Sequence, residues 1–348
     1  MFRISLDRLD DLFAGIARDR VLYVPMERAG VMDFGIWPPK TPETHVCLDY
    51  LNTLRSIKDF FLPQTENIVA FKREGKKITI IPSQKEPAPF AVFGARGCDV
   101  RSLDVLDRVF LSDPVDTFYK AQRDNGVILS LACAEPEETC FCSAFDIDAT
   151  EPPGDVVMRV VGDFLCWEAK TPAGEALTDT LKDVLSEAGS EDKAKVEEHR
   201  KAAKTAMEEL PLARLSLEGW GSEKLLEKFG SAFWGKLSQA CVGCGTCTYI
   251  CPTCQCYDIQ DFDTGHGIKR FRCWDSCMFS DFTLMAHGNP RKSQLERFRQ
   301  RFMHKLVYFP DNNDGMYSCV GCGRCISKCS ISMNIVKVIK ALGGNANV

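Results

Sequence analysis

Two stretches of the sequence each carry four cysteines at intervals of three, three and four residues. The first, CVGCGTCTYIC, begins at Cys241, and the second, CVGCGRCISKC, begins at Cys319. Closely spaced thiols can form disulfides, but that chemistry needs an oxidising compartment, and the N-terminal MFRISLDRLDDLFAG is charged and amphipathic rather than a secretory signal. We therefore expect a cytoplasmic protein whose thiols are reduced and free to bind a metal.

The spacing within each run, C-x2-C-x2-C-x3-C, is typical of [4Fe-4S] clusters, in which three thiolates bind one cluster and the fourth reaches a second cluster. The glycines between the thiols let the backbone turn tightly around the sulfurs. Zinc sites usually pair two C-x2-C knuckles, so the repeated pattern favours iron and sulfur. The prediction is two clusters with crossed fourth ligands: cluster one on Cys241, Cys244, Cys247 and Cys329, and cluster two on Cys319, Cys322, Cys325 and Cys251.

A second set of thiols lies in the first half of the chain. Cys98 and Cys133 each follow a predicted strand, so both should emerge at the same edge of a sheet, and Cys140 and Cys142 lie on the loop just beyond. Four thiolates that converge there would suit a third cluster. The alternative is that these cysteines are buried or redox-sensitive thiols without a metal.

Four further cysteines lie in or near the segment between the two runs: Cys254, Cys256, Cys273 and Cys277. Three interpretations of this group stay open, namely a fourth cluster, ordinary packing, or a specialised site with a non-cysteine ligand. The remaining two cysteines, Cys47 and Cys166, are expected to be small core residues.

The elements that must position these thiols divide the chain into three parts. Over residues 1–170, short apolar runs alternate with amphipathic stretches, which predicts an α/β domain. Residues 171–215 are rich in Ala, Glu and Lys and predict a helical linker. Because the two cysteine runs are far apart, helices must fill the gap, so residues 216–348 predict an all-α, α-helical-ferredoxin-like domain that carries two [4Fe-4S] clusters. The predicted strands cover residues 20–24, 67–72, 77–82, 90–94, 126–133 and 155–162, and the first predicted helices cover 5–18 and 99–110.

Composition excludes several functions. The chain has 348 residues and a net charge of −5, and no apolar run approaches the ~20 residues that a membrane span requires. The acidic balance does not favour nucleic acid as a partner, and we expect the one basic segment, residues 291–305, to be a solvated helix face. Neither a G-x-G-x-x-G nor a G-x-x-x-x-G-K-[ST] motif occurs, so we expect no flavin or nucleotide bound by this chain itself.

Several longer stretches resemble one protein family. CGTCTYICPTCQCYD, RCWDSCMFSDFTLMAHGNPR and CVGCGRC, together with FGARGCDVRSLDVLDRVFL and CAEPEETCFCSAF, are similar to the dicluster electron-transfer subunits that anaerobic sulfite reductases share with cytoplasmic sulfhydrogenases, in which they are the β subunits. The resemblance implies an electron-transfer subunit that lies between two partners, a flavin-containing, NAD(P)H-reductase-like subunit on one side and the catalytic subunit of a reductase or hydrogenase on the other. The alternative is a catalytic chain that reduces a sulfur compound itself, at the group around Cys254 and Cys277.

Overall fold

The N-terminal half is built on a nine-stranded sheet in the order β11-β1-β10-β9-β8-β7-β2-β3, with β4 paired to β2. The computed structural model describes residues 1–83, 86–265 and 267–343. Strand β7 pairs in parallel with β2 and β8, and β8 pairs in parallel with β9, whereas the other pairs are antiparallel. The strands are β1 Phe2–Ser5, β2 Val21–Arg28, β3 Val31–Ile36, β4 His45–Val46, β7 Phe90–Ala95, β8 Gly126–Leu131, β9 Val156–Val161, β10 Phe164–Ala169 and β11 Ser186–Glu187.

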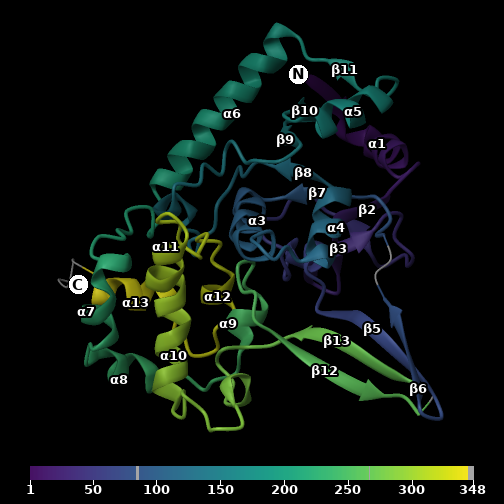
Figure 1. Ribbon diagram of the computed structural model, residues 1–348. Helices are drawn as coiled ribbons and strands as arrows, with labels where there is room; N and C mark the ends of the chain where they lie inside the picture. Colours follow the sequence, from purple (N-terminus) through teal and green to yellow (C-terminus); the bar gives the residue numbers. More distant parts are fainter. Residues whose placement is uncertain (84–85, 266, 344–348) are drawn as a thin grey trace.

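Helices cover both faces of this sheet, as Figure 1 shows. On one face, Leu12 and Phe13 of the first helix pack with Leu177 over the strands. On the other face, Leu103 and Phe110 belong to a second apolar core. The expected α/β domain is therefore confirmed. Its helices are α1 Leu9–Ile16, α2 Lys58–Phe61, α3 Gly97–Phe110, α4 Thr117–Asn125 and α5 Pro172–Thr180.

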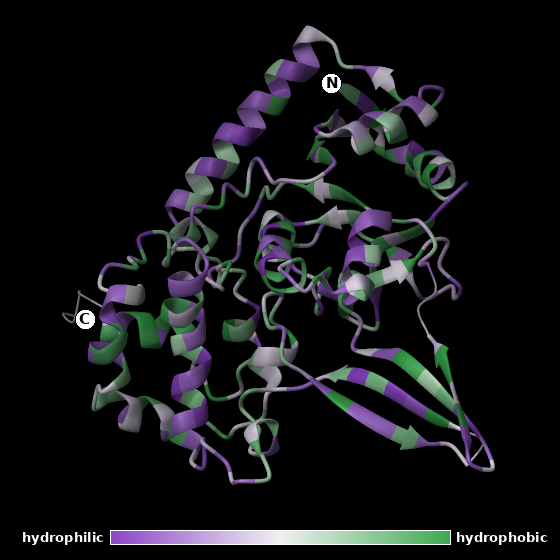
Figure 2. Cartoon of the chain, viewed as in Figure 1, coloured by the Kyte–Doolittle hydropathy of each residue, from purple (hydrophilic) through white to green (hydrophobic). Residues whose placement is uncertain are grey.

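Residues 171–215, expected as a linker, contain two kinds of structure. The first part packs on the sheet, because Leu177 of α5 lies in its core and β11 pairs with β1. The second part is α6, Ser190–Glu208, a long helix that runs along one side of the molecule towards the C-terminal helices (Figure 1). Its surface is largely hydrophilic (Figure 2), and Ala203 is its one fully buried residue.

The C-terminal half has a core of its own that continues into the α/β half. Trp234 packs edge-on against Phe298, with ring centroids 6.2 Å apart, and Phe141 and Phe145 from the α/β half join the same cluster. The helices here are α7 Leu225–Phe229, α8 Phe233–Ser238, α9 Thr246–Tyr249, α10 Gln294–Met303, the π-helical turn His304–Tyr308, α11 Phe309–Asn312, α12 Arg324–Ser327 and α13 Ile335–Leu342.

The expectation of an all-α second domain is wrong, because this half also contributes two strands to a second sheet. Strands β12 Tyr257–Asp263 and β13 Ile268–Trp274 form a hairpin, and β5 Thr65–Glu74 and β6 Lys77–Pro82 form another. The order β12-β13-β5-β6 joins them into one four-stranded sheet that projects from the body (Figure 1). Its base is held by Arg272, which is buried and donates to Glu66 and Asp116.

Candidate iron–sulfur centres

The two cysteine runs fold in the same way. Gly245 and Gly323 are both left-handed, with φ of 74° and 77°, and each is the N-cap of a short helix, α9 or α12. This conformation is disfavoured for residues with a Cβ, which explains a glycine at the same place in each run. The repeated sequence therefore forms a repeated local structure, in which a tight turn carries the first thiols and a helical turn carries the third.

The structure brings Cys251 of the first run to the second run. Burial is the largest cause that raises the pKa of Cys319, Cys322 and Cys325, and a thiolate at Cys251 raises the pKa of all three further. A hydrogen bond supports this proximity, because Thr253 Oγ1, two residues after Cys251, donates to the carbonyl of Ser318, the residue before Cys319, at 2.9 Å. This proximity supports the prediction that Cys251 is the fourth ligand of cluster two.

The first run is more open. The thiol of the exposed Cys244 donates to Thr246 Oγ1 at 3.3 Å, and Gln294 Nε2 donates to Cys241 Sγ at 3.4 Å. Cys329 lies just beyond α12, and its thiol donates to the Met333 carbonyl at 3.4 Å. The assignment of Cys329 as the fourth ligand of cluster one stays a prediction.

The four cysteines of the α/β half line one cavity. Cys98 is near the N-terminus of α3, Cys133 follows β8, and Cys140 and Cys142 lie on the next loop, and all four face this cavity together with Cys322 of the second run. Burial is the largest cause that raises the pKa of these thiols, to about 12 for Cys140 and Cys142. A thiol with so high a pKa is protonated near neutral pH, and metal binding is one way to bring it to the thiolate form.

The loop that carries these thiols packs directly on the second run. The Phe141 N–H donates to the Gly321 carbonyl at 2.9 Å, and Asn52 Nδ2 donates to the Cys322 carbonyl at 3.1 Å. A Cβ on Gly321 would lie 2.4 Å from the Phe141 carbonyl, so only glycine permits this approach. The candidate third site and the second cysteine run are therefore neighbours.

The structure separates the four cysteines whose function the sequence left open, Cys254, Cys256, Cys273 and Cys277. Cys256 lies close enough to Cys277 for each thiol to shift the pKa of the other, and the same holds for Cys251 and Cys254. Cys273 lies apart on β13, where Asp258 and Asp275 are its charged neighbours. Across the described ranges, no three Cys, His, Asp or Glu side chains converge closely enough to hold a single metal ion. The ligands of a [4Fe-4S] cluster bind different irons and do not need to meet at one point.

Cys47 and Cys166 lie outside all three groups. The Cys166 side chain is buried with Phe164 of its own strand, β10, and with Val161 of the neighbouring strand β9. The Cys47 thiol donates to the Asp49 carbonyl at 3.3 Å.

Three buried cations beside the thiols were missed by sequence reasoning. Lys58 Nζ donates to the carbonyls of Cys251 and Cys254 and lies 3.6 Å from the centre of the Trp274 ring. Arg301 and Lys305 are also buried, so the expectation that residues 291–305 form a solvated face is wrong for one side of α10. The signal was present in the alternation of Phe298, Arg301 and Phe302, because an apolar stripe on a basic helix indicates a buried face.

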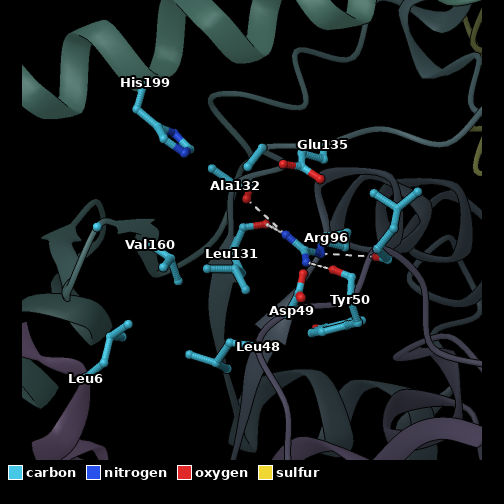
Figure 3. Close-up of a pocket in the computed structure, with 13 residues that line it drawn as sticks. Leu6, Leu48, Asp49, Tyr50, Arg96, Leu131, Ala132, Glu135, Val160 and His199 are labelled. Carbon is cyan, nitrogen blue, oxygen red and sulfur yellow. Dashed lines mark hydrogen bonds between the residues drawn. The ribbon is translucent and has the colours of Figure 1, made fainter. Parts of the chain in front are cut away.

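An open cavity of about 510 Å³ lies next to the α/β thiols (Figure 3). Arg96 lines both this cavity and the one that holds the four cysteines. Its guanidinium donates to the backbone carbonyls of Tyr50, Leu51, Leu131 and Ala132. Arg96 therefore holds the loop after β8 in place and forms a wall between the two cavities.

Paired C-x2-C-x2-C-x3-C runs in matching conformations are typical of iron–sulfur proteins of the dicluster class. Comparison with known families agrees, because residues 240–333 match the 4Fe-4S dicluster domain family. The β subunit of sulfhydrogenase 2 from Pyrococcus furiosus is 30% identical over 295 residues, which cover 84% of each chain. The chain belongs to this family of iron–sulfur electron-transfer subunits. Among the residues that the structure describes, no helix is long and apolar enough to cross a membrane.

Proposed function

We propose that this chain relays single electrons through three [4Fe-4S] clusters inside a larger oxidoreductase complex. Two clusters are held by the paired runs, and the third by the cysteines of the α/β half: Cys98, Cys133, Cys140 and Cys142. When bound, such clusters accept and release one electron at a time. The observation that carries this proposal is the close packing of Gly321 of the second run on Phe141, which supports a third centre beside cluster two.

The three proposed centres differ in how far their thiols are shielded from solvent. Cys244 of cluster one is exposed, whereas the thiols around cluster two and the third site are largely buried. Phe141 and Val320 contribute to the apolar core beside them and exclude water from the path. Electrons thus have one entry or exit near Cys244 and another near the open cavity beside Arg96.

The proposed partners follow from the difference between two-electron hydride transfer and one-electron transfer by iron–sulfur clusters. A hydride carries two electrons, whereas a cubane carries one, so NAD(P)H oxidation belongs to a flavin-containing, reductase-like subunit. A catalytic reductase or hydrogenase subunit would take the other end of the path. The name of the Pyrococcus furiosus relative, which is one subunit of a sulfhydrogenase, supports a multi-subunit setting.

Anaerobic purification from the native source tests the proposal. We expect a flavoprotein and a catalytic subunit to co-purify with the chain, and about 12 irons per chain. The chain alone should not pass electrons from NADH to viologen. NADH oxidation by the flavin-free chain would contradict the relay function.

A second candidate function is the reduction of a sulfur compound by the chain itself. The contact between Cys256 and Cys277, close to the buried cations Arg301 and Lys305, favours it, because cations stabilise thiolates and anionic sulfur species. The chain supplied with electrons from an artificial donor would then reduce sulfite, polysulfide or a disulfide as fast as the whole complex. A rate far below that of the complex would leave the relay as the function.

A further inference from the structure

Arg301 lies between the two cysteine runs. Its Nη2 donates to the Cys247 carbonyl at 3.1 Å. Burial most strongly raises the pKa of Cys247 and of Cys325, and Arg301 is the largest influence that opposes burial at both thiols. Cys247 and Cys325 are the third cysteines of the first and second runs, and the helical turns that carry them, α9 and α12, pack against each other. Arg301, which donates to the backbone of the first run at Cys247, therefore lies close to both runs.

The charge of Arg301 has no carboxylate partner in the described part of the chain. The side chain is 3% exposed, forms no ion pair with Asp or Glu, and its Nε has no hydrogen-bond acceptor. An unpaired buried charge costs several kcal/mol, and arginine cannot release its proton to avoid this cost. Arg301 lies beside the thiols of the two runs, which become thiolates when they bind a metal. The ligands of both predicted clusters would then supply the negative charge that compensates Arg301.

We propose that Arg301 tunes the reduction potentials of cluster one and cluster two together. This role rests on the proposed function, because it requires a cluster on each run. Reduction adds one negative charge to a cluster, so a fixed cation nearby stabilises the reduced form more than the oxidised form. A buried cation is screened little by salt, so the effect persists at physiological ionic strength. Arg301 thus keeps both clusters reducible by the same donor.

Lys305 provides the contrast. Its Nζ donates to Thr253 Oγ1 and to the Ser318 carbonyl, and the thiols that act on its charge include Cys251 and Cys319, the predicted ligands of cluster two. Lys305 should therefore tune cluster two alone. A shared effect from Arg301 and a one-sided effect from Lys305 cannot both arise from general loosening of the fold.

The experiment is a redox titration of the anaerobically purified full chain, followed by low-temperature EPR. In Arg301→Met and Arg301→Gln we expect both cluster potentials to fall, each by at least a tenfold change in the reduction equilibrium constant, about 59 mV for one electron. Arg301→Lys keeps the charge and should shift them less. Lys305→Met should lower one potential only, and Arg299→Met, which removes a cation stacked on Phe229 at the surface of the same helix, should change neither.

Iron content measured on the same samples separates the possible failures. A wild-type chain with far fewer than about 8 irons would contradict the proposed function itself. Wild-type iron with unshifted potentials in Arg301→Gln, or a shift in one cluster only, would overturn the role of Arg301. If both neutral variants lose iron, retention of iron by Arg301→Lys supports the need for a cation, whereas equal loss in all three variants overturns it.

Discussion

Arg324, between two cysteines of the second run, forms a buried bidentate ion pair with Asp99, the residue after Cys98. Nη1 is 2.6 Å from Oδ1 and Nη2 is 2.9 Å from Oδ2, and the two side chains are 3% and 2% exposed. Arg324 Nε also donates to the Thr53 carbonyl at 3.0 Å. One ion pair therefore joins the second cysteine run to α3, which carries Cys98.

The first prediction concerns this ion pair. Asp99→Asn should lower the free energy of unfolding by about 3–5 kcal/mol, because it leaves the Arg324 charge buried and unpaired. The control is Asp314→Asn, which removes the exposed partner of Arg108 and should cost at most about 1 kcal/mol. Anaerobic denaturant titration measures both. An equal decrease in the free energy of unfolding in the two variants would show that burial does not determine how much the Asp99–Arg324 ion pair contributes to stability.

A second prediction tests the third cluster. Cys140→Ser should reduce the iron content from about 12 to about 8 per chain, because one of four ligands is lost. Cys166→Ser alters a thiol that is equally buried but lies in the strand core away from the cavity, and should keep all the iron. Iron analysis with protein quantitation decides. A wild-type chain with about 8 irons, unchanged in Cys140→Ser, would show that this cavity holds no cluster.

The third prediction compares two glycines. Gly243→Ala and Gly321→Ala both place a Cβ at positive φ, at 68° and 58°, which costs about 1–2 kcal/mol each. The Cβ at Gly243 meets the flexible side chain of Gln294, whereas the Cβ at Gly321 meets the backbone of Phe141. Gly321→Ala should therefore lower the melting temperature more and release iron from the third site. The same loss from both variants would contradict a specific junction at Gly321.

The crossed ligands give a fourth prediction. Cys251→Ser should damage cluster two, although Cys251 is the last cysteine of the first run, because the chain after Cys251 packs against Ser318 at the start of the second run. Cys329→Ser should damage cluster one. EPR spectra of the two variants distinguish the clusters. If each substitution altered only the cluster of its own run, the exchange of ligands would be refuted.

The fifth prediction concerns pH. Burial, followed by the charge of Lys305, lowers the pKa of His304 from 6.5 to about 4. Because the folded pKa lies below the unfolded one, stability falls as the pH drops from about 6.5 towards 4, by about 2 kcal/mol between pH 7 and pH 5. His304→Gln should lose less over that range. Parallel stability profiles for the variant and the wild type would exclude this contribution.

The sequence by itself determined the local chemistry. The interval between thiols is a property of a few consecutive residues, and a glycine such as Gly245 reports its own backbone conformation, so the paired runs could be recognised directly. Strands such as Phe90–Ala95 and Gly126–Leu131 were predictable for a similar reason, because apolar residues between turn residues indicate a buried strand. The α/β domain and the dicluster class followed from such signals.

Only the tertiary structure decided which distant segments of the chain are in contact. The pairing of β5 with β13 joins residues from opposite halves of the chain, and no local pattern marks that partnership. The burial of Arg301 and Lys305 was equally hidden, since a charged residue on a helix is normally solvated and these two are buried by packing around the clusters' ligands. The approach of Gly321 to Phe141 depends on both halves at once. Spacing is encoded locally, whereas contact between distant segments is selected by the packing of the whole chain.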